Sequence, residues 1–119
     1  SGSRDKTARI FDIESGECTS VLEGHHGSVY TCDWNSSGAL ALTGSADKTL
    51  RVWVAATGAC AQVLEGHSAA VCCCSWSCAG DGARWVISGS DDETLRLWDL
   101  EEGQNYGVLE GHTGPVLSC

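Results

Sequence analysis

The chain has 119 residues, of which 16 are acidic and 7 basic, so its formal net charge at pH 7 is −9. This charge disfavours nucleic acid as a partner, because binding to a phosphate backbone needs Lys and Arg to displace counterions. No apolar run approaches the ~20 residues of a membrane helix, and residues 1–20 lack the basic start and apolar block of a signal peptide. We therefore expect no membrane partner and a cytoplasmic or nuclear location.

Short runs rich in Val, Leu and Trp alternate with Gly, Ser, Asn and Asp turns, which predicts antiparallel strands. Residues 1–24 predict the last two strands of an incomplete sheet, through TARIFDI and CTSVLEG. Residues 25–66 predict four strands, within SVYTCDW, ALALTGS, TLRVWVA and ACAQVLEG. Residues 67–111 predict four more, within AVCCCSW, RWVISGS, TLRLWDL and NYGVLEG. Residues 112–119 predict the first strand of a further sheet.

Several landmarks return at a fixed step along the chain. Gly-His stands at 24–25, 66–67 and 111–112, which gives steps of 42 and 45 residues. The Gly-Ser pairs and the aromatic residues Phe11, Trp53 and Trp98 keep the same steps. Three added residues in SCAGDGA, which contains the turn pair Asp81-Gly82, account for the longer step and predict a lengthened hairpin. A period in the low forties that opens on Gly-His and closes on Trp-Asp is typical of one four-stranded propeller blade.

These markers make the chain resemble the WD-repeat (WD40) β-propeller family over almost its whole length. The resemblance implies an all-β fold, a partial WD40-type propeller of consecutive four-stranded antiparallel blades. The chain holds slightly under three repeats, whereas closed propellers have about four to eight blades, so we expect a fragment of a larger ring. Two positions depart from the family pattern, because Phe11 replaces the usual Trp and Val54 replaces the usual Asp.

The resemblance also implies a structural hydrogen-bond network in each blade, which joins a His, a hydroxyl, an Asp and a Trp. The matching positions are His25, Thr43, Asp47 and Trp53, then His67, Ser88, Asp92 and Trp98. A hydrolase triad built from the recurring His and Asp is the enzymatic alternative. Duplication at the repeat period favours architecture, because catalysis needs one exposed nucleophile and an oxyanion hole. We therefore predict no enzymatic activity, no catalytic residue and no cofactor.

Eight cysteines raise the question of disulfides or zinc. Two sets are repeat-equivalent and about one blade apart, which disfavours bridges within a set: Cys32, Cys74 and Cys119, and Cys18 and Cys60. The one candidate metal cluster is formed by Cys72, Cys73, Cys74 and Cys78 with His67. Because neighbouring residues of a strand point to opposite faces, these thiols are not expected to converge on one ion, and we predict no metal site. Free thiols indicate a reducing compartment.

In the WD-repeat family, partner contacts commonly flank the first-strand Val and precede the network Asp. The positions that match are Arg4, Ser28, Tyr30, Ala46, Ala70, Cys72, Asp91, Pro115 and Leu117. Tyr30 is the strongest candidate, since Tyr is enriched at interface hot spots. The resemblance thus implies a non-catalytic scaffold for protein–protein interaction, with a protein or peptide as partner and a basic one as an option. The alternative is a fragment that completes a ring as a homo-oligomer.

Overall fold

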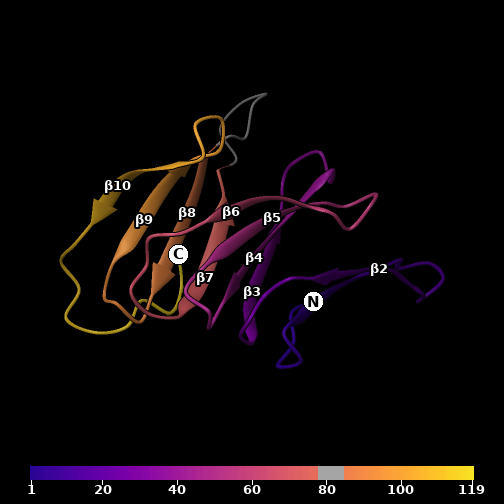
Figure 1. The fold of residues 1–119 in the computed structure, drawn as a ribbon, viewed down its shortest axis with the longest axis horizontal. Coiled ribbons are helices and arrows are strands. Elements are labelled where there is room, and N and C mark those ends of the chain that lie inside the picture. Colours follow the sequence, from indigo (N-terminus) through magenta and orange to yellow (C-terminus); the bar gives the residue numbers. More distant parts are fainter. Residues whose placement is uncertain (78–84) are drawn as a thin grey trace.

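The computed structural model describes residues 1–77 and 85–119, and the predicted hairpin turn at Asp81 and Gly82 lies outside these ranges. None of the described residues belongs to a helix that could span a membrane. The described residues form ten strands (Figure 1): β1 (Thr7–Phe11), β2 (Cys18–Glu23), β3 (Val29–Trp34), β4 (Leu40–Ser45), β5 (Leu50–Val54), β6 (Cys60–Leu64), β7 (Val71–Trp76), β8 (Trp85–Ser90), β9 (Leu95–Asp99) and β10 (Gln104–Leu109).

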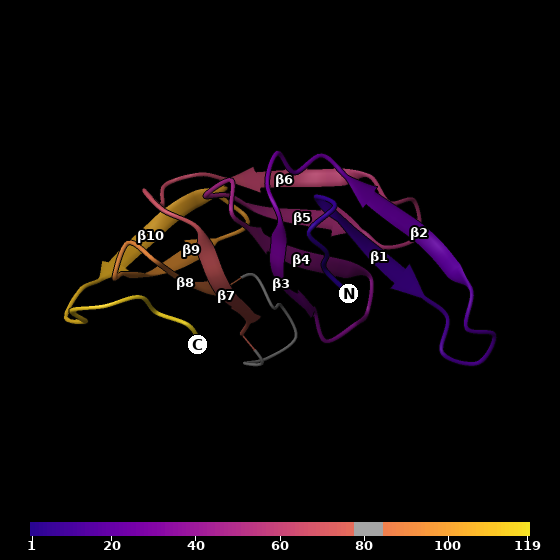
Figure 2. The same cartoon turned by 90° about the horizontal axis from the view of Figure 1, so that it is seen from below.

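The strands form three antiparallel sheets in which each strand pairs with the next one along the chain. β3, β4, β5 and β6 form one four-stranded sheet, β7 to β10 form another, and β1 pairs with β2. The prediction of an all-β chain with consecutive four-stranded antiparallel sheets is therefore confirmed. The sheets follow one another in chain order across the molecule, with β1 and β2 at one end and β10 at the other (Figure 2).

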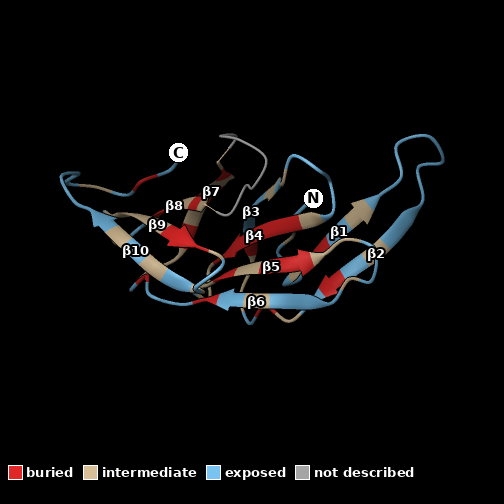
Figure 3. Ribbon diagram, turned by 90° about the horizontal axis from the view of Figure 1, so that it is seen from above, coloured by how far each residue is buried: buried red, intermediate tan, exposed pale blue. Residues whose placement is uncertain are grey.

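The inner strands carry the core and the outer strands face solvent. β4 is buried along nearly its whole length, whereas β6 is mostly exposed (Figure 3). Apolar side chains of β4 and β5 meet those of β7 and β8 between the two complete sheets, in a cluster that includes Leu42, Leu50, Val71 and Val86. A smaller cluster joins β1 and β2 to the next sheet through Leu22, Val29 and Trp53, among others. Each sheet is therefore stabilised by the next, as expected of stacked repeats.

A glycine–valine contact recurs at each junction between neighbouring units. The glycine of each Gly-Ser pair lies against a valine of the next unit, so an added Cβ would come within 2.7, 2.7 and 2.6 Å of that side chain. The pairs are Gly2 with Val29, Gly44 with Val71, and Gly89 with Val116. No real Cβ makes such short contacts, so these positions need glycine for close packing. The periodic glycines thus set the spacing between sheets.

Both terminal segments add to this arrangement. Gly2 forms a bridge with Ala8, so the first residues continue the β1–β2 sheet. Residues 112–119 form no strand, because a strand needs a hydrogen-bonded neighbour and the chain supplies none there. Their backbone nevertheless docks where a first strand begins. The Val116 N–H donates to the Ser90 carbonyl at 3.0 Å, just as the Val29 N–H donates to the Ser3 carbonyl at 2.9 Å.

Candidate functional site

The first polar network crosses the β3–β6 sheet. His25, just before β3, has Nδ1 2.8 Å from Asp47 Oδ2 and Nε2 2.7 Å from Thr43 Oγ1. The Trp53 indole N–H donates to the same Thr43 hydroxyl at 2.8 Å. His25, Thr43 and Trp53 are buried. The four predicted residues therefore lie in one continuous chain of hydrogen bonds.

The second network repeats this geometry in the β7–β10 sheet. His67 has Nδ1 2.8 Å from Asp92 Oδ2 and Nε2 2.8 Å from Ser88 Oγ. The Trp98 indole N–H donates to Ser88 Oγ at 2.8 Å. The imidazole and indole rings meet edge to face in both networks, with centroids 6.0 and 6.1 Å apart. The two networks therefore have the same hydrogen-bond connectivity and nearly the same distances.

Protonation follows from burial and from the hydrogen bonds. Burial lowers the pKa of His25, although its hydrogen bond to Asp47 opposes the shift. Burial alone would raise the pKa of Asp47, but hydrogen bonds from Thr49, the His26 N–H and His25 outweigh it and lower this pKa to about 2. The network therefore holds a neutral imidazole beside a carboxylate. In this state Nδ1 donates to Asp47, Nε2 accepts from Thr43, and the hydroxyl accepts from the indole, which satisfies every group.

The network Asp also shapes the turn that carries it. Asp47 Oδ1 accepts from the Thr49 N–H at 3.0 Å and from the Thr49 hydroxyl at 2.6 Å. Ser45 Oγ accepts from the Asp47 N–H at 3.2 Å, and Lys48 takes a positive φ of 74°. The same turn occurs at 3–7 and 90–94. The turn role of Ser45 and Thr49 was not predicted from the sequence, although the S-x-D-x-T pattern recurs at the repeat step.

The Ser88–His67–Asp92 arrangement has the connectivity of a hydrolase triad without its accessibility. Ser88 is 0% exposed, and its hydroxyl oxygen already accepts the Trp98 indole N–H. A nucleophile must face a substrate and lie near an oxyanion hole. This hydroxyl is instead committed to joining two buried rings. The geometry favours a structural role.

The two terminal units hold parts of a network. Asp5 bonds to Thr7 through both the backbone N–H at 3.0 Å and the hydroxyl at 2.6 Å. In the same unit the Ser1 amino group donates to the Arg9 carbonyl and the Ser1 carbonyl accepts from the Arg9 N–H, both at 2.8 Å. His112, which follows Gly111 in the last Gly-His pair, is exposed. Among the described residues, complete networks therefore lie in the two four-stranded sheets and not in the terminal units.

The Arg51 side chain packs over Trp53, the tryptophan of the first network. The Arg51 guanidinium carbon lies 5.9 Å from the Trp53 ring centroid, within the range of a cation–π contact. A Cβ at Gly24 would come within 2.6 Å of Arg51 Nη1 and 3.3 Å of the Trp53 ring, and Gly66 has matching neighbours in Arg96 and Trp98. The Gly of each of these Gly-His pairs therefore leaves space for the arginine.

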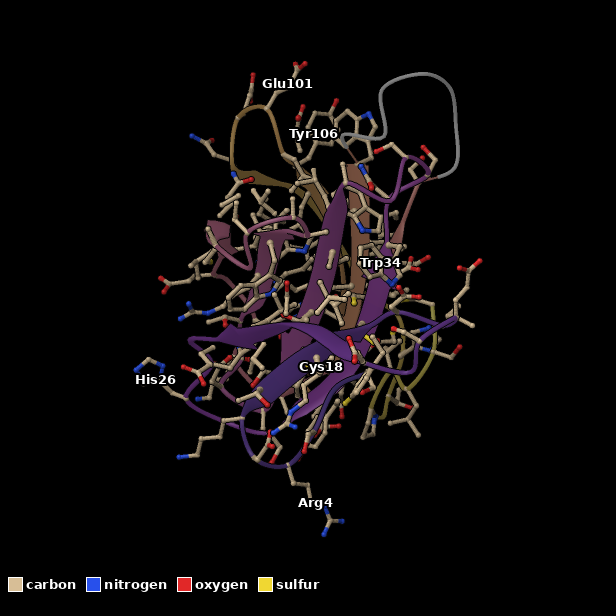
Figure 4. The ribbon with its side chains drawn as sticks, turned by 90° about the vertical axis from the view of Figure 1, so that its right-hand side faces the viewer. Arg4, Cys18, His26, Trp34, Glu101 and Tyr106 are labelled. Atoms are coloured by element: carbon tan, nitrogen blue, oxygen red, sulfur yellow. The ribbon has the colours of Figure 1, made fainter. Side chains whose placement is uncertain are left out.

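The candidate partner positions lie beside the networks, at the end of each sheet where the first strand begins. The Ala46 N–H donates to the Ser28 carbonyl at 2.8 Å, and the Asp91 N–H donates to the Ala70 carbonyl at 3.0 Å. Arg4 projects from one end of the molecule, while Tyr106 lies at the opposite end (Figure 4). Arg4, Tyr30, Asp91, Pro115 and Leu117 are exposed, and Ser28, Ala46, Ala70 and Cys72 are half-buried.

A β-bulge explains why Tyr30 and Cys72 leave the sheet pattern. Val29 pairs with Ser45, but Thr31 pairs with Gly44, so Tyr30 is an extra residue in β3. The register of β7 shifts in the same way around Cys72. Bulges often re-aim side chains, and Tyr30 is 57% exposed here. The simple alternation that we predicted for Cys72, Cys73 and Cys74 is therefore interrupted at Cys72.

The described cysteines are all free thiols: Cys18, Cys32, Cys60, Cys72, Cys73, Cys74 and Cys119. Cys78, part of the candidate zinc cluster, lies outside the described residues. Within residues 1–77 and 85–119 no group of three potential ligands is arranged to hold a metal ion. Cys72 Sγ lies 3.2 Å from Asp91 Oδ1. Burial and this neighbouring carboxylate raise the pKa of Cys72 to about 11, so the thiol is a poor nucleophile at neutral pH.

Comparison with known families matches the description "WD domain, G-beta repeat" at residues 16–54 and 58–99. Each matched repeat holds the outer strand of one sheet and the first three strands of the next, so repeats and sheets are out of phase. A search of the curated proteins finds no match. WD40 repeats generally act as scaffolds for protein–protein interaction and are typically non-catalytic. The matches span more than half of the chain, which therefore belongs to the WD-repeat (WD40) family.

Proposed function

We propose that this chain is a non-catalytic part of a larger propeller that binds a protein or peptide through a surface we call the bulge face. The bulge face comprises Arg4, Ser28, Tyr30, Ala46, Ala70, Cys72, Asp91, Pro115 and Leu117. The supporting observation is the exposure of apolar side chains at repeat-equivalent positions. Tyr30 is 57% exposed and Leu117 72% exposed, and Cys72 occupies the matching position between them.

The chemistry of the bulge face suits a polypeptide. The Tyr30 side chain combines a large apolar ring with a hydroxyl that can donate or accept, which is typical of interface anchors. Leu117 supplies further apolar area, whereas Ser28, Ala46 and Ala70 are small and leave room for an incoming chain. The recurring His and Asp side chains contribute little to recognition, because they are committed to the internal networks.

The charge of the chain favours a basic partner. Its net charge of −9 attracts cationic segments over several ångströms and repels a phosphate backbone. Asp91 supplies an exposed carboxylate on the bulge face itself. A cytoplasmic or nuclear location belongs to the same proposal, because free thiols persist in reducing compartments.

The test is a selection of peptides from a random displayed library against the immobilised full chain. Enriched peptides are then titrated against the Tyr30→Ala, Leu117→Ala double variant. Loss of two exposed anchors should weaken binding by about tenfold or more, since hot-spot truncations cost ~2 kcal/mol or more. Tyr106→Ala is the matched control, because Tyr106 is 70% exposed at the opposite end of the molecule.

The proposal also predicts the composition and placement of the selected peptides. They should be enriched in Lys and Arg, and their binding should weaken at high salt. Equal binding by the wild type and the folded double variant would exclude the bulge face as the binding site. If the selected peptides lose affinity only for the Tyr106→Ala variant, the binding site lies at the opposite end of the molecule and the proposal is wrong.

Self-association is the second candidate function, favoured by the incomplete first sheet. The first sheet contains only β1 and β2 among the described residues, and residues 1–3 hydrogen-bond along the inner edge of β1 from Thr7 to Arg9, so only the end of that edge at Phe11 lacks a strand neighbour. Phe11 is 48% exposed and Ile13 98% exposed next to this edge. Open edges promote pairing between chains. Light scattering should then show a mass that grows with concentration, and a constant monomer mass excludes this candidate.

A further inference from the structure

Two cysteines face each other across the junction between β7 and the terminal segment 112–119. The repeat makes Thr31 equivalent to Cys73, and Cys74 equivalent to Cys119. At the first junction Thr31 Oγ1 lies 3.5 Å from Cys74 Sγ, across the boundary between β3 and β7. By this equivalence the positions that form the same contact one unit later are both occupied by thiols, those of Cys73 and Cys119. Repeat-equivalent cysteines such as Cys74 and Cys119 lie about one blade apart, whereas Cys73 and Cys119 occupy the facing positions of one junction.

The surroundings of Gly89 bring both thiols to one place. Cys73 Sγ and Val116 Cγ1 each lie 2.6 Å from the position of a Cβ on Gly89, so β7 and the terminal segment meet over this glycine. Cys119 Sγ lies 3.9 Å from the Ile87 carbonyl oxygen, two residues earlier on β8. Burial and then contact with the Cys73 thiol raise the pKa of Cys119. The two sulfur atoms thus share one environment.

We propose that Cys73 and Cys119 form a reversible disulfide that fastens residues 112–119 to β7. A low-molecular-weight disulfide such as oxidised glutathione supplies the oxidising equivalents. The thiolate of Cys119, the exposed partner, attacks that disulfide and releases one glutathione thiolate. The deprotonated Cys73 then attacks the mixed disulfide and releases a second glutathione thiolate. Two protein thiols and one glutathione disulfide become one protein disulfide and two glutathione thiols.

Reach and accessibility both support this bridge. A disulfide brings its sulfur atoms to ~2.0 Å, and side-chain rotation can close the 3.5 Å seen at the equivalent Thr31–Cys74 contact. Cys73 is 7% exposed and Cys119 is exposed, so a dissolved oxidant reaches the second and the first resolves the intermediate. The raised pKa of the Cys119 thiol predicts slow oxidation at neutral pH and faster oxidation at mildly alkaline pH.

The experiment oxidises the folded full chain with oxidised glutathione, blocks the remaining thiols and maps the products by tryptic digestion and mass spectrometry. Cleavage after Arg96 releases a peptide, 97–119, in which Cys119 is the only cysteine. We expect this peptide to be linked to the tryptic peptide 52–84, which contains Cys73. The link should disappear in Cys73→Ser and in Cys119→Ser, and persist in Cys74→Ser. Added dithiothreitol should release it.

Thr31→Cys is the positive control, because it places a thiol at the equivalent position opposite Cys74. This variant should gain a second bridge, between position 31 and Cys74, under the same oxidation. If the gained bridge forms while peptide 97–119 carries only a glutathione adduct, the proposal is overturned. It is equally overturned if Cys119 links to another cysteine, or if neither bridge forms, because the inferred geometry is then absent.

Discussion

Val71 of β7 packs directly on Gly44 of β4, and a Cβ added to that glycine would lie 2.7 Å from Val71 Cγ1 and 2.7 Å from Thr31 Cγ2. Both Val71 and the strand around Gly44 are buried. Gly44→Ala should therefore lower the free energy of unfolding by about 1–3 kcal/mol, through overpacking between sheets. Urea denaturation measures this loss.

Gly107→Ala is the control for Gly44→Ala, because a Cβ at Gly107 meets no atom within 4 Å. This variant should change the free energy of unfolding by less than about 1 kcal/mol. The double variant Gly44→Ala, Val71→Ala should lose less stability than the two single losses combined, since the smaller side chain relieves the crowding. Strict additivity would show that the two residues do not interact.

Asp33 links two sheets by hydrogen bonds that do not depend on apolar packing. Its Oδ2 accepts from the Trp76 backbone N–H at 2.9 Å and from the Ser75 hydroxyl at 3.2 Å, both on β7. Asp33→Ala should lower the free energy of unfolding by about 1–3 kcal/mol, because charge-assisted hydrogen bonds across the junction are lost. Asp33→Asn keeps one acceptor oxygen and should lose less, and an equal loss in both variants would contradict this account.

Stability should fall as the solution is acidified, in two stages. Burial holds the pKa of His25 and of His67 below the ordinary 6.5, so below that pH the unfolded chain binds protons that the folded chain excludes. The free energy of unfolding therefore decreases as pH falls from 6.5 towards the folded-state values. A second decrease follows between pH 3.8 and about 2, as the carboxyl of Asp47 is protonated first in the unfolded chain.

The pH dependence is measured as urea midpoints at a series of pH values from neutral to acidic. His67→Gln should reduce the slope below pH 6.5, because one buried imidazole no longer contributes. His26→Ala should keep the slope, since the His26 side chain is exposed and lies outside both networks. A midpoint that rises on acidification through pH 6.5 would show that the network histidines are charged when folded.

Much of the architecture could be predicted from the sequence because it is repeated. Gly-His, Gly-Ser and Trp recur at steps of 42 and 45 residues, and this register identifies the four members of each network. Alternating apolar runs located the strands, since burial on a pleated sheet has a period of two. The hydrogen bonds of His25 and His67 then follow from their equivalent positions.

Other features depend on how separate strands meet, which the sequence does not state. The bulge at Tyr30 and the contact of Asp33 with β7 leave no local pattern that could reveal them. The sequence shows Gly44 as one of the periodic glycines, but it does not show that this glycine packs against Val71. The repeat predicts the first strand of a further sheet at residues 112–119, but this segment has no strand neighbour among the described residues and forms no strand.

The geometry of both networks indicates that the recurring His, Asp and hydroxyl groups stabilise the sheets. Urea denaturation of Ser88→Ala tests it most directly, with Ser68→Ala, an exposed serine, as the matched control. Ser88→Ala removes the partner of both His67 Nε2 and the Trp98 indole N–H, so we predict a loss of about 2–4 kcal/mol in the free energy of unfolding. A Ser88→Ala variant as stable as Ser68→Ala would contradict the account.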